Sequence, residues 1–197
     1  MQPIGGLVLD KKTFYAPHLG VALPHLGWIP APRYSMRRAL VLELAGQIKG
    51  SVLDIGCGPG ALLVDFKRLG CDPVGLEISS ESHQISKSLS QEINIYSSPK
   101  DNWKGHFDLI MALEVLEHLE DDKKELAIWK SWMKGSATAI FSVPAHPMLW
   151  NERDINVGHY RRYSKKSLIK LLTDAGFDVQ SVNYYGFPIA TLSLIHI

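Results

Sequence analysis

Three glycines within five positions separate a short apolar segment from a segment with helical periodicity. Gly56, Gly58 and Gly60 follow SVLDI (51–55) and precede an apolar helical pattern that starts near residue 62. Glycine adopts left-handed backbone conformations and lets the backbone approach a ligand without an intervening Cβ atom. A strand, a glycine loop and a helix in this order predict a ligand-binding corner of an α/β sheet.

The rest of the chain repeats this alternation of strands and helices. Apolar runs predict further strands at 73–78, 93–96, 107–113, 137–143 and 177–185, and helical periodicity predicts helices at 33–49, 62–69, 80–91, 121–133 and 164–175. Such alternation is typical of an α/β fold with a Rossmann-like, mostly parallel sheet and helices on both faces. Ligands of these sheets bind at the carboxyl ends of the strands, so we expect the site there.

Composition limits the classes of partner. The chain has 197 residues, enough for one domain, and a net charge of +1, which gives no bulk field to attract nucleic acid. The two cysteines, Cys57 and Cys71, lack zinc-ligand spacing, and we see neither a signal peptide nor an apolar run long enough to span a membrane. We therefore expect a cytoplasmic protein that acts on a small molecule, with no nucleic-acid partner and an undefined oligomeric state.

Two acidic residues indicate the kind of cofactor. Asp54 lies two residues before the first glycine, where its carboxylate would repel a pyrophosphate but would suit an ammonium group. Glu77 ends the second strand, where an acid can accept both hydroxyls of a ribose. Because Gly56, Gly58 and Ala61 also satisfy the dinucleotide pattern, a nicotinamide-dependent oxidoreductase is an alternative, which Asp54 disfavours. In a further alternative, both carboxylates cap backbone amides.

Taken together, VLDIGCGPG, GLEIS and FDLIMALEVLEHL resemble the class I methyltransferases that use S-adenosylmethionine (SAM), in particular the type 11/12 branches, from about residue 50 to 186. The resemblance implies that the glycine loop surrounds the methionine and ribose portions of SAM, that Ile78 packs on adenine, and that Ser98 or Asp101 lies near it. The implied cofactor-binding residues are Asp54, Gly56, Cys57, Gly58, Gly60, Glu77, Ile78, Ser98, Ala112, Leu113 and Glu114.

Glu114, Glu117 and His118 have the spacing E-x-x-E-H, and residues at i, i+3 and i+4 share one face of a helical turn. With His159, this segment resembles the metal-binding segment of ubiquinone-type O-methyltransferases and of small-RNA 2′-O-methyltransferases. Magnesium bound there would bring a substrate hydroxyl close and help its deprotonation. Because EVLEHL is also common in metal-free methyltransferases, magnesium is the interpretation that we do not favour.

The segment 143–164 is aromatic and polar, and it lies where the family places contacts with the methyl acceptor. His159 and His146 are candidate general bases. The candidate acceptor-binding residues are Trp150, Tyr160, Arg161 and Tyr163, and the pair Arg161 and Arg162 would suit a carboxylate or phosphate. In the alternative interpretation, Asp154 pairs with an arginine and the tyrosines pack in the core. Arg37 and Arg38 are expected on a solvated helix surface.

The function expected is methyl transfer from SAM to a small-molecule acceptor that carries an oxygen, nitrogen or carbon nucleophile. The two arginines favour an anionic acceptor. A SAM-binding module without catalysis is a second alternative, against which the two histidines argue. Residues 1–49, with an irregular proline-rich start and a helix, are expected to form a substrate lid, and residues 50–191 the SAM-binding domain.

The chain end raises a separate expectation. Residues 192–197 (LSLIHI) resemble the translation of a sequencing adaptor, and only twelve residues, 186–197, follow the strand at 177–185. We therefore expect the chain to be truncated, with the seventh strand of the class I sheet missing. Residues 187–197 would then pack poorly, and the sixth strand would keep unpaired backbone groups.

Overall fold

The computed structural model describes residues 12–87, 89, 92–185 and 192–196. Within these ranges the sheet has seven strands in the order β5-β4-β3-β6-β7-β9-β8. The strands are β3 (Ser51–Ile55), β4 (Asp72–Leu76), β5 (Asn94–Tyr96), β6 (Phe107–Leu113), β7 (Met133–Pro144), β8 (Ser181–Tyr185) and β9 (Leu192–His196). The first five in this order are parallel, which confirms the predicted Rossmann-like α/β sheet.

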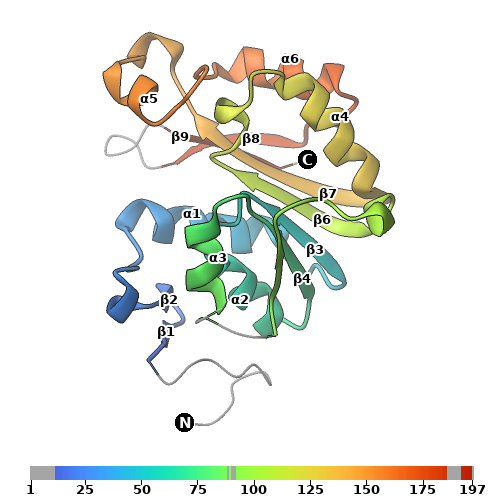
Figure 1. The fold of residues 1–197 in the computed structure, drawn as a ribbon. Coiled ribbons are helices and arrows are strands. Elements are labelled where there is room, and N and C mark those ends of the chain that lie inside the picture. Colours follow the sequence, from blue (N-terminus) through green and yellow to red (C-terminus); the bar gives the residue numbers. More distant parts are fainter. Residues whose placement is uncertain (1–11, 88, 90–91, 186–191, 197) are drawn as a thin grey trace.

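Helices cover both faces of the sheet (Figure 1). They are α1 (Pro32–Ala45), α2 (Ala61–Arg68), α3 (Ser80–Lys87), α4 (Asp122–Trp132), α5 (Glu152–Asn156) and α6 (Lys165–Asp174). Local sequence sets several ends: Ser164 caps α6 as predicted, Asp121 caps α4, and Pro32 begins α1. Four 3-10 turns, η1 (Pro24–Leu26), η2 (Asp101–Trp103), η3 (Leu116–His118) and η4 (Pro147–Leu149), lie between these elements.

Two apolar clusters divide the strand residues by face. Leu53 and Ile55 of β3 pack with α4 and α6, whereas Val52 packs with α1 and α2. Because side chains alternate along a strand, Asp54 belongs to the same face as Val52. The helix α1 therefore lies over the face toward which Asp54 is directed, and this places α1 beside the predicted cofactor site.

The N-terminal part of the chain is more regular than expected. Within the predicted irregular segment, β1 (Phe14–Ala16) and β2 (Gly20–Ala22) form an antiparallel pair. Side chains from this hairpin pack against α2 in a third apolar cluster that includes Val21 and Val64. Prolines bound the short strands without preventing them, which is why the density of prolines misled the sequence interpretation. Residues 1–11 of the predicted lid lie outside the described residues.

The predicted loss of the seventh strand is wrong. The strand β9 lies between β7 and β8 and pairs antiparallel with both, so that Leu194 is in register with Ser142 on one side and Asn183 on the other. The backbone of β8, expected to be unpaired, is therefore paired with β9. Six positions separate β8 from β9, and a connection of that length is ordinary for adjacent strands. Residues 187–191 and 197, for which we expected poor packing, lie outside the described residues.

Among the described residues, no helix combines the length and the apolar character that crossing a bilayer requires.

Candidate active site

The glycine loop folds tightly against its neighbours. Gly56, Gly58 and Gly60 all have positive φ, at 69°, 54° and 80°. The N–H of Gly56 donates to the carbonyl of Leu76 at 2.7 Å, which ties the loop to the end of β4. A Cβ atom on Gly56 would approach Cγ2 of Val115 to 2.5 Å. Both backbone conformation and space therefore require glycine at this position.

Asp54 is buried, with 4% of its surface exposed, at the end of β3. Burial, as the largest effect, raises the pKa of its carboxyl to about 7; Arg37 opposes this rise and Glu77 adds to it. A carboxyl group that is costly to ionise in the free protein favours a cationic partner, because a nearby positive charge stabilises the ionised form. This behaviour fits the ammonium group that the sequence predicts at Asp54.

Asp54 lies in a cavity of about 200 Å³ between α1 and the glycine loop. Two donors on the wall of this cavity lack hydrogen-bond partners among the described residues: the Tyr34 hydroxyl and Nη1 of Arg37. Nη1 of Arg37 is 3.8 Å from Oε1 of Glu114, which is too far for a hydrogen bond. The cavity is lined by Trp28, Tyr34, Arg37, Arg38, Asp54, Gly56, Cys57, Gly58, Pro59, Ala61, Leu62 and Leu113.

The position of Arg37 and Arg38 corrects the sequence interpretation, which left both on a solvated surface. Arg38 is buried and pairs with Asp65, whereas Arg37 faces the cavity. Apolar periodicity marks the face of α1 that packs on the sheet, but it does not show what lies at the edges of that face.

Glu77 accepts two backbone hydrogen bonds, from the N–H of Gly58 at 2.9 Å and from the N–H of Ser79 at 2.8 Å. This is the backbone-capping alternative considered from the sequence. An ionised carboxylate offers about four acceptor positions, so these two bonds leave capacity for ribose hydroxyls. Beside it, Ile78 is 87% exposed and Ser98 is also exposed.

Burial raises the pKa of the Cys57 thiol well above its ordinary range. Cys57 is therefore protonated at neutral pH and unsuited to act as a nucleophile.

The chain turns sharply where β6 and β7 end. Glu114 and His146 are the non-glycine residues with positive φ in the described chain, at 62° and 61°. Ala112 is buried in β6, Leu113 lines the smaller cavity, and Glu114 accepts a hydrogen bond from Oγ of Ser142 at 2.8 Å. Strained backbone of this kind is concentrated at functional sites, and here it lies at the predicted edge of the sheet.

A larger cavity, of about 730 Å³, adjoins the first. Leu113 lines the smaller cavity and the next residue, Glu114, lines the larger one, so the two are neighbours. The volume lies within the range of small-molecule sites. Its walls are formed by Ala31, Pro32, Arg33, Met36, Glu114, Glu117, His118, Pro144, Arg153, Asp154, Val157, His159 and Arg162.

His159 is oriented by a buried carboxylate. Nδ1 of His159 lies 2.9 Å from Oδ1 of Asp154, and Nε2 lies 3.9 Å from Oε1 of Glu117. Burial tends to raise the pKa of Asp154, but the hydrogen bonds from Arg162, from the backbone N–H of Asn151 and from His159 together lower it. This carboxylate therefore only accepts hydrogen bonds. The proton of a neutral His159 is therefore on Nδ1, and Nε2 is free to accept a proton.

Three of the four candidate metal ligands come together. One ligand atom each from Glu117, His118 and His159 lies within 4.8 Å of the others. Glu117 is completely buried, and neither of its carboxylate oxygens has a hydrogen-bond partner among the described residues. Burial, reinforced by Glu114, raises the pKa of Glu117. The fourth candidate, Glu114, is directed to Ser142 and Arg37 instead.

These residues fit a metal ion, since an unpartnered buried carboxylate lies beside two imidazoles, one of which donates to Asp154 in the way typical of a ligand histidine. Burial, as the largest effect, and the neighbouring His159 lower the pKa of His118, which favours the neutral form that binds metals. Two nitrogens and one oxygen suit a transition-metal ion better than magnesium, which prefers oxygen ligands.

Several predicted acceptor contacts are occupied by other residues of the chain. Arg161 pairs with Asp122 at 2.7 Å. Tyr163 is 4% exposed, and its hydroxyl donates toward Oδ2 of Asp122 at 2.8 Å. Arg162 pairs with Asp154, as the structural alternative expected.

Three further predicted residues of this segment, His146, Trp150 and Tyr160, are not among the residues that line the larger cavity. The ring of His146 stacks on Tyr184 with a centroid separation of 5.3 Å, and Trp150 and Tyr160 are exposed. Of the two candidate bases, only His159 lines the larger cavity.

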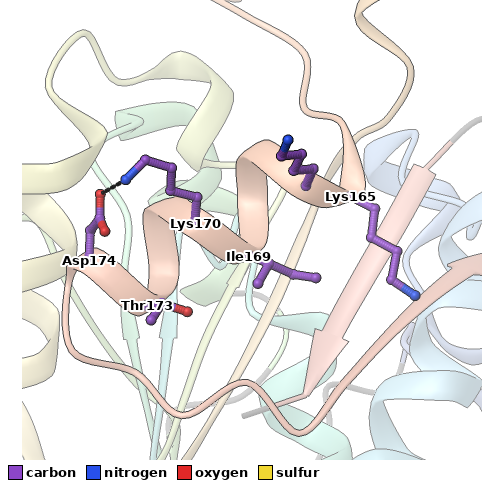
Figure 2. Close-up of a pocket in the computed structure, with 6 residues that line it drawn as sticks. Lys165, Ile169, Lys170, Thr173 and Asp174 are labelled. Carbon is purple, nitrogen blue, oxygen red and sulfur yellow. Dashed lines mark hydrogen bonds and ion pairs between the residues drawn. The ribbon is translucent and has the colours of Figure 1, made fainter.

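A further hollow, of about 600 Å³, is open to solvent on the outer side of α6 (Figure 2). Its six lining residues all belong to this one helix, and Lys170 pairs there with Asp174 at 2.8 Å. A surface formed by a single helix does not enclose a ligand, and the hollow contains none of the groups of the two cavities at the sheet edge. We therefore assign it no part in the site.

The comparisons with known proteins agree with this geometry. Residues 32–182 match the family model described as a methyltransferase domain. The ubiquinone biosynthesis O-methyltransferase of Photorhabdus laumondii is 28% identical over 116 residues, which cover 54% of this chain and 48% of the relative. The chain thus spans about half the length of such relatives.

Solved structures show the same fold. A SAM-dependent methyltransferase from Mesorhizobium loti aligns with a TM-score of 0.66 and 14% identity, over 84% of this chain and 97% of the other. The 1,6-didemethyltoxoflavin-N1-methyltransferase of Burkholderia thailandensis, with bound S-adenosylhomocysteine, aligns with a TM-score of 0.65 and 18% identity, over 81% and 75%. The names of these neighbours include S-adenosylmethionine or its demethylated product, which agrees with the predicted cofactor class. The chain therefore belongs to the methyltransferase-domain family and has the class I SAM-dependent fold.

Proposed function

We propose that the protein transfers the methyl group of SAM to a hydroxyl group of a small molecule bound in the larger cavity. The observation that carries this proposal is the Asp154–His159 pair, which leaves Nε2 of His159 as a proton acceptor on the cavity wall. A hydroxyl is a weak nucleophile until its proton is removed, so a positioned base is what an oxygen acceptor requires. The O-methyltransferase name of the ubiquinone-pathway relatives supports the same choice.

The smaller cavity would hold the amino-acid end of SAM. The Asp54 carboxylate would bind the ammonium group, while the unpartnered Nη1 of Arg37 and hydroxyl of Tyr34 would bind the carboxylate. Opposite charges on facing walls complement a zwitterion and fix its orientation. Glu77 would accept the ribose hydroxyls, and the exposed Ile78 would pack against adenine.

Bound SAM supplies a methyl group already activated by the adjacent sulfonium, so the chain contributes mainly alignment. Methyl transfer would join the acceptor oxygen to the methyl carbon as the carbon–sulfur bond breaks, and S-adenosylhomocysteine would be the product. The hydroxyl proton passes to Nε2 of His159, and Asp154 stabilises the imidazolium that results. Trp28 and Tyr34 line the cofactor cavity, and we propose that the described part of the predicted lid, residues 12–49, covers the cofactor.

A second candidate role for the same residues is metal-assisted deprotonation, which the unpartnered carboxylate of Glu117 favours. Glu117, His118 and His159 would then hold a cation that lowers the pKa of the acceptor hydroxyl. His159 would serve as a ligand in this case, and the base would be another group.

The proposal is tested by methyl transfer from radiolabelled SAM to a panel of amines and hydroxylated small molecules, each hydroxyl compound being paired with the same molecule blocked as its methyl ether. We expect label in the hydroxyl compounds alone, and S-adenosylhomocysteine in equal amount. Label in amines, with none in any hydroxyl compound, would contradict an oxygen acceptor. Glu77→Gln should weaken SAM binding by about 1–3 kcal/mol through the lost charge-assisted bonds.

A further inference from the structure

The arginines around the larger cavity fall into two groups. Arg162 donates from Nε to both carboxylate oxygens of Asp154 at 2.9 Å. Arg161 pairs with Asp122 and also donates to the carbonyl of Glu120 at 2.7 Å. The two residues that the sequence indicated as an anion site are therefore already neutralised and held in place.

Arg33 and Arg153 form the other group. Both line the larger cavity, Arg33 from the first turn of α1 and Arg153 from α5. Within the described chain, neither guanidinium forms a hydrogen bond or an ion pair. These two side chains come from separate elements, so the fold brings two free guanidinium groups to one cavity.

Among the described residues, none of the carboxylates on the cavity wall forms an ion pair with either group. Asp154 is paired with Arg162, and Glu114 is bonded to Ser142 with Arg37 close by. Among the described residues of this wall, Arg33 and Arg153 are therefore the arginines whose guanidinium groups have no ion-pair partner.

The wall also has apolar residues, among them Met36, Pro144 and Val157. We propose, on the basis of the function proposed above, that the methyl acceptor is an anionic hydroxy compound whose carboxylate or phosphate is held by Arg33 and Arg153. The apolar residues contact its carbon frame, and the reacting hydroxyl lies at His159. A guanidinium binds either anion in a bidentate, charge-assisted manner, so both sources share this chemistry.

The test measures binding by titration calorimetry to protein saturated with S-adenosylhomocysteine. The probes are 4-hydroxybenzoate and phenyl phosphate, with 4-hydroxybenzamide as the neutral match to the first. We expect at least one anion to bind about tenfold or more tightly than the neutral amide, as expected for hydrogen bonds to charged groups. The anion that binds more tightly shows whether the site recognises a carboxylate or a phosphate.

Arg33→Gln and Arg153→Gln should each weaken binding of the preferred anion about tenfold and leave affinity for the amide unchanged. Lys165→Gln, which removes a positive charge on α6 away from the cavity, is the matched control and should change neither. Equal affinity for anions and amide, or anion binding that both variants retain, overturns the inference. Binding of S-adenosylhomocysteine is measured first in each protein and tests the proposed function separately. If the wild type does not bind it, the proposed function is contradicted. If the wild type binds it but does not prefer the anions, only the inference about the acceptor fails.

Discussion

The Oδ1 atom of Asp154 accepts a hydrogen bond of 2.9 Å from Nδ1 of His159. Asp154 is itself fixed by Arg162 and by the N–H of Asn151 at 3.0 Å, as part of the capping box that begins α5. The orientation of the His159 ring is thus coupled to a local helix start. A functional side chain held in this way is positioned before any substrate binds.

His159→Gln should lower kcat by about 10²–10⁴-fold, the usual contribution of a positioned base. Affinity for SAM should stay unchanged, because the smaller cavity does not include His159. Steady-state kinetics and calorimetry measure the two quantities separately. His146→Gln is the matched control, since that ring stacks on Tyr184 outside the cavity, and we expect it to retain most activity. Wild-type turnover in His159→Gln would falsify the role of His159.

Removal of metal tests the second candidate role. If Glu117, His118 and His159 hold a cation, EDTA should lower the melting temperature, and Mn²⁺ or Zn²⁺ should restore it more effectively than Mg²⁺. Glu117→Gln should abolish this response, whereas Glu114→Gln, directed to Ser142, should retain it. If neither EDTA nor any of the three ions changes the melting temperature, the metal-binding role is rejected and His159 is left with the role of general base.

The affinity for S-adenosylhomocysteine should depend on pH through Asp54. Burial raises the pKa of Asp54 to about 7. Below this pH the carboxyl group is mostly protonated, so it must lose its proton before it can pair with an ammonium group. Binding should therefore weaken about tenfold for each pH unit below 7 and level off above it. Calorimetry between pH 5.5 and 8.5 measures this slope. Asp54→Asn should bind weakly with no slope, and a slope that persists in this variant would assign the titration to another group.

The same shift has a consequence for the stability of the free protein. The folded carboxyl holds its proton up to about pH 7, whereas the unfolded one loses it near its ordinary pKa of 3.8. Between these values the native state binds more protons than the unfolded state, so the contribution of Asp54 to stability falls as pH rises. SAM binding would offset this loss.

How much of this could be predicted from the sequence depends on how local each feature is. The limits of β3 and β6 agree with the predicted strands at 51–55 and 107–113, because buried parallel strands are continuous apolar runs. The glycine loop and Asp54 could be predicted equally well from the sequence, since their geometry is set within a few residues. The helix α5 was not predicted, because five residues are too few to show helical periodicity.

The arginines show where local information ends. Residue type indicated an anion site at Arg161 and Arg162, but Asp122 and Asp154 neutralise them across loops that only the fold brings together. Conversely, Arg33 and Arg37 lie four residues apart on one side of α1, and their place at the cavities depends on how that helix crosses the sheet edge. Their i, i+4 spacing was the one available signal.

The buried pair of Arg38 and Asp65 should stabilise the docking of the N-terminal hairpin on α2. Arg38 donates to both carboxylate oxygens of Asp65 at 2.6 Å and to the carbonyl of Pro17 at 2.9 Å. Arg38→Met leaves Asp65 buried without its charge partner, so we expect a loss of about 3–5 kcal/mol in urea denaturation. The double variant Arg38→Met with Asp65→Leu should regain most of it. A single variant as stable as wild type would show that Asp65 finds other compensation.

The strand β9 provides the last prediction, because it is central between β7 and β8 and not an edge. Successive N–H groups of a central strand donate alternately to its two neighbours, so a proline at any interior position removes a ladder bond and leaves an acceptor unpaired. Leu194→Pro should therefore lower the free energy of unfolding by about 1–3 kcal/mol. Leu194→Ala, which keeps its N–H, separates the backbone effect from the side-chain effect. If both variants unfold at the same urea concentration, the backbone pairing of β9 contributes nothing to stability. If Leu194→Pro alone unfolds at a lower urea concentration, that pairing stabilises the sheet.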